Sequence, residues 1–296
     1  MNYVVTGSLG HIGKPLAVRL VEAGHSVRIV SHNRERRPQI ESLGAEAAIG
    51  SVEDAGFLTE AFRGADGLFT MAPPDFTGGG WKEQIARIGR NFAHAIGASG
   101  VRHVVNLSSI GAHLHTGCGP INGLHQVELA LDALQGVNVR HLRAAYFYTN
   151  FINSIPAIKS EGVISANYGP NTLMVLAHPE DIADEAAWEL QHPSFLGKGF
   201  RYIASDEQRT GEIAAILGRA ISKPGLRWVD RTDKEVYGEM LRLGLPEELA
   251  KNYTEMGTAI RSGEMMAHYF GHRPVLAGWR RFESFAEEFA AAYAGT

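Results

Sequence analysis

The sequence predicts an α/β protein: a doubly wound parallel sheet followed by a smaller, mostly helical C-terminal lobe. Three observations predict it. A short apolar run at the N-terminus leads directly into a glycine-rich turn and then an amphipathic stretch. Apolar runs and helical stretches then alternate as far as Arg143, as expected when helices connect parallel strands. Beyond Arg143 the alternation loosens and amphipathic helical patterns dominate.

The glycine-rich turn is the strongest local signal. It follows a strand at Tyr3–Val5 and precedes a helix that ends at Gly24. Glycines at this spacing let the backbone approach a pyrophosphate, whose charge the free N–H groups of a helix start can hold. An ordinary strand-to-helix turn is the alternative. The residues expected to bind a dinucleotide here are Thr6, Gly7, Leu9, Gly10, His11, Ile12 and Gly13.

Further strands and helices follow in order. Apolar runs predict strands at 27–30, 45–49, 67–71, 101–107, 137–142 and 200–204. Helical spacing of apolar residues predicts helices over 57–62, over 85–96, in a stretch that begins at His125, in one that opens at His178, and in most segments from Thr210 onward. We expect a Rossmann-type dinucleotide-binding domain at 1–150, completed by about 179–205. Residues 151–178 and 206–296 are expected to form a substrate-covering lobe.

The end of the second strand predicts which dinucleotide binds. A site specific for NAD usually has an acid there, but none occurs between Gly24 and Arg34. Asn33 and Arg34 stand in its place, with Arg36 and Arg37 close behind. Guanidinium groups pair well with a 2′-phosphate, so we expect NADP(H), with weaker binding of NAD(H). Which arginine meets the phosphate stays open, and a solvated basic loop is the alternative.

Other cofactor-binding candidates follow the carboxyl ends of later strands, where ligands of such sheets bind. These are Ser51, Met71, Ala72, Pro73, Ser108 and Ser109.

Composition excludes several functions. The 296 residues carry a net charge of −4, with 45% hydrophobic and 20% charged residues. This charge gives no argument for binding nucleic acid or an anionic membrane. No apolar run is long enough to span a membrane, and the first strand begins too early for a signal peptide. With one cysteine, Cys118, the chain has no internal disulfide. We expect a cytoplasmic monomer or homodimer.

Several motifs resemble the NmrA-like branch of the atypical short-chain dehydrogenase/reductases. The turn at Thr6–Gly13 is similar to TGxxGxxG, and Leu107-Ser108-Ser109 is similar to the motif of the fifth strand. The stretch Leu142–Asn150 resembles LRPxxFxxN, and the helix start at His178–Ala183 recurs in that branch. The resemblance implies an NADP-binding fold. The branch includes quinone and dye reductases, iminium-reducing enzymes and non-catalytic redox sensors.

The usual catalytic dyad of that superfamily is missing. None of the nine tyrosines is followed by lysine at the fourth position, and no lysine lies between Lys82 and Lys159. The missing dyad disfavours alcohol–ketone chemistry. It also disfavours a third functional hypothesis, that the protein is a nucleotide-sugar epimerase or dehydratase. His125 is the candidate proton donor, because it lies close to the position where relatives carry lysine. If the alignment with those relatives is off by one residue, Leu124 occupies that position instead. Tyr146 is the second catalytic candidate and a further cofactor-binding candidate.

Planar apolar side chains suggest the substrate class. We expect Phe76, Trp81, Phe147 and Tyr148 to line a pocket for a quinone-like, dye-like or iminium acceptor. A cofactor-ratio sensor that regulates a partner protein is the alternative. His113, His115, Cys118 and His125 could suggest zinc, but their spacing matches no usual structural zinc site, so no metal is expected.

Overall fold

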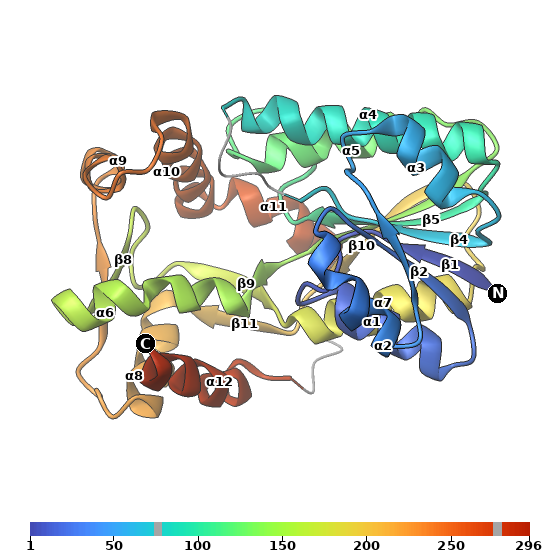
Figure 1. Ribbon diagram of the computed structural model, residues 1–296. Helices are drawn as coiled ribbons and strands as arrows, with labels where there is room; N and C mark the ends of the chain where they lie inside the picture. The colour runs from blue at the N-terminus through green and yellow to red at the C-terminus, as the bar shows by residue number, and fades with distance from the viewer. Residues whose placement is uncertain (74–78, 275–279) are drawn as a thin grey trace. The chain divides into compact units, whose positions relative to one another are not determined.

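The structure, a computed structural model, describes residues 1–73, 79–274 and 280–296 (Figure 1). This part of the chain divides into two compact units. The first comprises Met1–Ala112, Gly123–Arg143 and Ile182–Arg201. The second comprises His113–Asn122, Ala144–Asp181 and Tyr202–Thr296.

The first unit is built on a seven-stranded sheet in the order β10-β6-β5-β4-β1-β2-β3. The strands are β1 (Asn2–Val5), β2 (Ser26–Ser31), β3 (Glu46–Ile49), β4 (Gly67–Thr70), β5 (His103–Ser109), β6 (Asn138–Ala144) and β10 (Lys198–Ile203). β1 pairs in parallel with β2 on one side and with β4 on the other. The strand order therefore reverses at β1, and the carboxyl end of such a switch point is where ligands bind. The predicted doubly wound parallel sheet is confirmed.

Helices cover both faces of this sheet (Figure 1). One face carries α3 (Ala55–Phe62), α4 (Trp81–Ser99) and α5 (Ile121–Asp132), and the other carries α1 (Gly13–Glu22), α2 (Arg37–Ser42) and α7 (Pro179–Gln191). A short 3₁₀ turn, η1 (Arg34–Arg36), leads into α2. The apolar stripe of α1 is buried as expected, since Leu16 and Leu20 are fully inaccessible.

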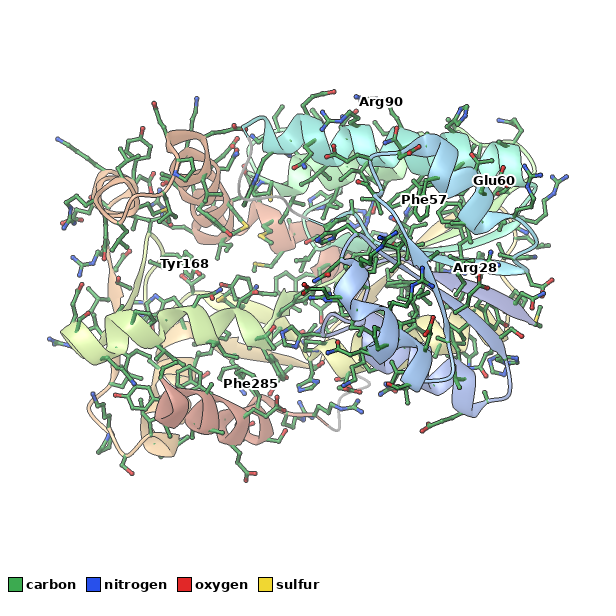
Figure 2. The ribbon with its side chains drawn as sticks, in the orientation of Figure 1. Arg28, Phe57, Glu60, Arg90, Tyr168 and Phe285 are labelled. Atoms are coloured by element: carbon green, nitrogen blue, oxygen red, sulfur yellow. The ribbon has the colours of Figure 1, made fainter. Side chains whose placement is uncertain are left out.

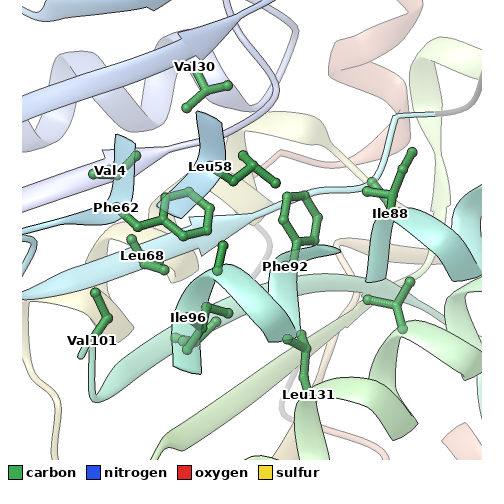
Figure 3. Packing of buried hydrophobic residues seen from close by; sticks show 14 of the residues in the cluster. Val4, Val30, Leu58, Phe62, Leu68, Ile88, Phe92, Ile96, Val101 and Leu131 are labelled. Carbon is green, nitrogen blue, oxygen red and sulfur yellow. The ribbon is translucent and has the colours of Figure 1, made fainter. Parts of the chain in front are cut away.

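The main core of the first unit lies between the sheet and α3 and α4 (Figure 3). Phe62 and Phe92 pack together with ring centroids 6.4 Å apart. Their neighbours Val4, Leu68 and Val104 come from three adjacent strands. Because helices cover both faces of the sheet, the sequences of these strands are continuous apolar runs. The core thus holds rigid the strand ends that carry the candidate site.

The second unit is mostly helical and contains two small sheets, β11-β9-β7 and β12-β8. Its strands are β7 (Tyr146–Phe147), β8 (Val163–Ala166), β9 (Leu173–Ala177), β11 (Asp206–Arg209) and β12 (Arg227–Asp230). Its helical segments are η2 (Tyr148–Ser154), α6 (Ile155–Glu161), α8 (Thr210–Ala220), α9 (Asp233–Arg242), α10 (Glu247–Ser262), α11 (Glu264–Gly271) and α12 (Phe282–Gly295).

One helix start differs from the sequence prediction. We expected a helix to begin at His125, but α5 begins at Ile121. The start is fixed by Pro120, which precedes it, and by Asn122. The Asn122 side chain accepts from the Cys118 N–H across 3.0 Å and donates to the Leu114 carbonyl across 2.9 Å. His125 therefore lies in the second turn of α5.

Candidate functional site

The glycine turn has the geometry that close approach of a phosphate requires. Gly7 has φ +96° and Ser8 has φ +55°, so the chain reverses sharply as β1 ends. A Cβ at Gly13 would lie 2.5 Å from the Ser8 carbonyl oxygen, which explains the third glycine as a packing requirement. A Cβ at Gly10 would meet only the Gly7 carbonyl oxygen, at 3.3 Å. Gly10 thus leaves room above the turn.

The turn also presents unused hydrogen-bond donors. Within the described residues, the backbone N–H groups of Leu9, His11 and Ile12 find no acceptor, while Lys14 N–H donates to Gly10. These groups lie just before α1, where the helix dipole favours an anion. Thr6 fixes the base of the turn, because its hydroxyl accepts from the Met71 N–H across 2.7 Å. The turn is therefore tied to the end of β4.

A pocket of about 590 Å³ opens beside this turn, at the carboxyl ends of β1, β2, β3 and β4. Its volume is within the range of small-molecule sites. It brings together four of the predicted cofactor residues: Gly7, Ser51, Met71 and Pro73. The other lining residues are Ser8, Val30, Ser31, His32, Arg36, Gly50, Val52, Glu53, Gln84 and Ile88.

Arg36, rather than Arg34, is the arginine that lines the pocket. Its Nη1 donates to the Ser8 hydroxyl across 3.1 Å, and Ser8 donates to the Ser31 hydroxyl across 2.8 Å. Arg34 is exposed, and the Asn33 side chain accepts from the Glu35 N–H, capping η1. Neither Asn33 nor Arg34 is among the lining residues. The cationic end of the pocket is therefore an arginine already fixed against the glycine turn.

The pocket lining also includes a carboxylate, Glu53. Its Oε1 accepts from Gln84 Nε2 at 2.9 Å and from Arg87 Nη2 at 3.2 Å. The Asn91 side chain donates to the backbone carbonyls of Val52 and Glu53. These contacts tie the segment after β3 to α4, so Glu53 is held by the fold and partly neutralised by Arg87.

The end of β5 contains a buried polar network that the sequence did not reveal. The Ser108 hydroxyl donates to Glu128 Oε1 across 2.6 Å. Arg143 donates to the same carboxylate from Nε at 3.0 Å and from Nη2 at 2.6 Å. The Arg143 guanidinium lies 4.3 Å from the centre of the Phe200 ring. The predicted cofactor residue Ser108 therefore uses its proton inside the protein. Ser109 donates to the Ile110 carbonyl.

His125 lies one helical turn before Glu128 on α5. Its Nδ1 is 2.9 Å from the Ala112 carbonyl oxygen. Because a carbonyl only accepts, Nδ1 carries the proton in this contact. The ring is thereby oriented by the segment that follows β5. His125 is half-buried, so it combines a fixed orientation with access to solvent.

The predicted substrate-pocket residues fall into different environments. Trp81 begins α4 and is only 4% exposed. Phe76 lies outside the described residues. Tyr148 is fully buried in the second unit, where its hydroxyl donates to the Arg280 carbonyl and its ring packs on Phe282. Its placement is that of a core residue.

Two further candidates of the second unit, Tyr146 and Phe147, form β7 and are half-buried. Tyr146 pairs with Leu176 of β9. Burial, and secondarily the nearby Tyr253, raises the pKa of Tyr146 to about 12. The phenol is therefore un-ionised at neutral pH and a weak acid.

Neither a metal-binding cluster nor a membrane-spanning helix is found among the residues that the structure describes. Within residues 1–73, 79–274 and 280–296, no three His, Cys, Asp or Glu side chains gather closely enough to hold a metal ion. None of the helices in these ranges is long and apolar enough to cross a membrane.

The fold and the glycine turn define a Rossmann-type α/β protein. The chain belongs to the NmrA-like family, whose sequence model matches residues 2–267.

Individual relatives and structures are similar to it. An NAD(P)H azoreductase from Xenophilus azovorans is 24% identical over 296 residues, covering 98% of each chain. The (4-alkanoyl-5-oxo-2,5-dihydrofuran-3-yl)methyl phosphate reductase of Streptomyces griseus subsp. griseus is 28% identical over 225 residues, or 75% of this chain and 74% of that protein. The crystal structure of an NADPH-dependent quinone oxidoreductase from Escherichia coli, complexed with NADPH, has a TM-score of 0.78 at 19% identity and covers 99% of both chains.

Proposed function

We propose that this protein is an NADP(H)-dependent oxidoreductase that reduces a small conjugated acceptor, quinone-like, dye-like or iminium, by hydride transfer. The observation that carries the proposal is the pocket beside the glycine turn, with Arg36 fixed at its wall. The names of the relatives support the reaction class, since they are reductases that include an NAD(P)H azoreductase.

The residues present fit a dinucleotide. We assign the pyrophosphate to the turn, where Leu9, His11 and Ile12 offer N–H groups. Apolar side chains of Val30, Val52 and Ile88 line the pocket and suit the adenine ring. NAD(H) would use the same contacts except those to the 2′-phosphate.

Arg36 accounts for the proposed preference for NADP(H). It is anchored by Ser8, so little side-chain entropy remains to be lost when a phosphate binds. The carboxylate of Glu53 would repel the negative charge of the 2′-phosphate, but it accepts hydrogen bonds from Gln84 and Arg87. The anchored Arg36 and the partly neutralised Glu53 together favour binding of NADP(H) over NAD(H).

When bound, NADPH supplies a hydride, and the protein has to orient the partners and provide a proton. We propose His125 as the proton donor, because its ring is oriented by the Ala112 carbonyl. Tyr146 is the other candidate, but with a pKa of about 12 it is a weak acid at neutral pH. The acceptors proposed need less proton management than an alcohol does, which is consistent with the missing Tyr/Lys dyad.

A second candidate function is a non-catalytic NADP(H)-binding redox sensor. The observation that favours it is the same missing dyad, because a sensor needs the cofactor site and no proton-transfer groups. The two functions share the pocket and differ in turnover.

A substrate panel tests the proposal. NADPH is mixed with the protein and 1,4-naphthoquinone, an azo dye or an imine, and NADP with a secondary alcohol. We expect protein-dependent NADPH consumption with one or more of the conjugated acceptors. Robust alcohol oxidation without turnover of any of them would refute the reaction class, and tight NADPH binding without turnover of any substrate would favour the sensor.

A further inference from the structure

The segment that follows β3 is held in a fixed conformation where it lines the pocket beside the glycine turn. Its residues Gly50, Ser51, Val52 and Glu53 all belong to the pocket lining. The ring of Phe57, labelled on α3 in Figure 2, lies 2.6 Å from the position of a Cβ at Gly50, so the glycine lets the segment pack closely on α3. The Ser51 hydroxyl accepts from the Glu53 N–H across 3.1 Å. The backbone that carries Glu53 therefore has a defined position.

The protein uses only one oxygen of the Glu53 carboxylate. Its Oε1 accepts from Gln84 Nε2 at 2.9 Å and from Arg87 Nη2 at 3.2 Å. Considering the residues that the structure describes, Oε2 accepts no hydrogen bond. The side chain is 42% exposed, so a ligand in the pocket can reach this oxygen. Glu53 thus offers an unused acceptor, and two side chains of α4 fix its orientation.

Apolar surface lies next to this polar contact. Gln84 and Ile88 both line the pocket and are four residues apart on α4, so they lie on the same face of the helix. Val30 and Val52 add further apolar surface to the pocket. Small-molecule sites commonly combine such apolar surface with a few placed polar groups. A flat nitrogen heterocycle fits this combination, with its faces on the aliphatic side chains and a donor on its edge.

We infer that Glu53 Oε2 accepts a hydrogen bond from the 6-amino group of the adenine ring, and that the pocket thereby selects a 6-aminopurine over a 6-oxopurine. The inference rests on the proposed binding of NADP(H) and adds a residue that selects the base. The amino group of adenine is a donor, whereas a 6-oxopurine carries an acceptor oxygen at the same place. Two acceptors that face each other repel and leave the carboxylate without a hydrogen bond.

Binding of two reduced cofactors that differ only in the base tests the inference. They are NADPH and deamino-NADPH, in which hypoxanthine replaces adenine. Dissociation constants are measured from the fluorescence of the reduced nicotinamide, for the wild type, Glu53→Gln and Glu83→Gln. Glu83→Gln is the matched control, because it also removes one negative charge beside α4. Glu83 is bonded to Arg90 at 2.5 Å, is not among the residues that line the pocket, and Arg90 is labelled in Figure 2.

The wild type should bind NADPH about tenfold more tightly than deamino-NADPH, because a hydrogen bond to a carboxylate is replaced by a contact between two acceptors. In Glu53→Gln the two dissociation constants should lie within about threefold of each other, because an amide can turn either its oxygen or its NH₂ group toward the base. The loss of charge acts on both cofactors alike and cancels in their ratio. Glu83→Gln should keep the wild-type ratio.

Equal affinity of the wild type for the two cofactors would overturn the inference without any variant. A wild-type ratio retained in Glu53→Gln, or an equal fall of the ratio in Glu83→Gln, would overturn it as well. Failure of the proposed function shows separately. Neither cofactor then binds, or NADPH binds in preference to deamino-NADPH and is oxidised by none of the acceptors.

Discussion

The guanidinium of Arg36 donates to the hydroxyl of Ser8 across 3.1 Å, which joins the segment after β2 to the glycine turn after β1. The two residues are 28 positions apart and line one pocket. A cation at this place has a defined position before any ligand arrives, and the preference for NADP(H) is expected to depend on it.

Arg36→Ala should therefore reduce the affinity for NADPH and leave that for NADH almost unchanged. A charge-assisted contact contributes about 1.5–3 kcal/mol, so the loss should be about tenfold to a hundredfold. The measurement is the dissociation constant of each cofactor from the fluorescence of the reduced nicotinamide. Arg34→Ala serves as the comparison, because Arg34 is exposed and does not line the pocket. A larger effect in Arg34→Ala would assign the phosphate to Arg34 instead.

Gly10→Val should abolish cofactor binding and leave the fold largely intact. The only close neighbour of a Cβ at Gly10 is the Gly7 carbonyl oxygen, at 3.3 Å, so the added side chain occupies the space proposed for the pyrophosphate. Binding is measured by fluorescence and folding by circular dichroism. Tight NADPH binding by folded Gly10→Val would show that the turn is structural only.

Gly13→Ala provides the contrast. Its Cβ would lie 2.5 Å from the Ser8 carbonyl oxygen, so the turn itself has to move, and we expect a loss of about 1–3 kcal/mol in the free energy of unfolding.

Glu128→Leu should be strongly destabilising. Arg143 and Ser108 would both lose Glu128 as their acceptor, and the buried guanidinium would lose its carboxylate, which costs about 3–5 kcal/mol. Urea unfolding measures the loss. The double variant Glu128→Leu/Arg143→Met should recover most of it, because no isolated charge remains. Equal stability of Glu128→Leu and the wild type would mean that the ion pair contributes nothing to folding.

His125→Ala should slow turnover of a conjugated acceptor by about 10²-fold if His125 is the proton donor. Binding of NADPH should be little changed, since His125 does not line the pocket beside the glycine turn. An unchanged turnover rate would remove His125 from the mechanism and leave Tyr146 or solvent as the donor.

Much of the fold could be predicted from the sequence, because it depends on local patterns. Buried parallel strands need continuous apolar runs, and the glycine spacing specifies how β1 joins α1. The strands β8 and β9 were not predicted. Residues 163–177, which contain both strands, do not follow the alternation of strand and helix. The strands that pair with them, β12 and β11, lie far along the chain.

The candidate site was harder to predict. Arg34, Arg36 and Arg37 fall within one helical turn, and only the direction of η1 decides that Arg36 lines the pocket. Glu128 and Arg143 belong to different elements, and their pairing depends on how α5 packs on the sheet. The ring of Phe151 contacts both Tyr146 on β7 and Trp228 on β12, although these two residues are 82 positions apart. Spacing along the chain carries no signal for such contacts.

Hydride transfer in a single turnover tests the central claim most directly. NADPH deuterated at C4 of the nicotinamide is bound to an excess of protein and mixed with 1,4-naphthoquinone, and the absorbance at 340 nm is followed. We predict a protein-dependent decay that is slower for the deuterated cofactor than for NADPH with hydrogen at the same position. NADPH that binds tightly while its absorbance stays constant, with naphthoquinone and with the other conjugated acceptors, would contradict the account.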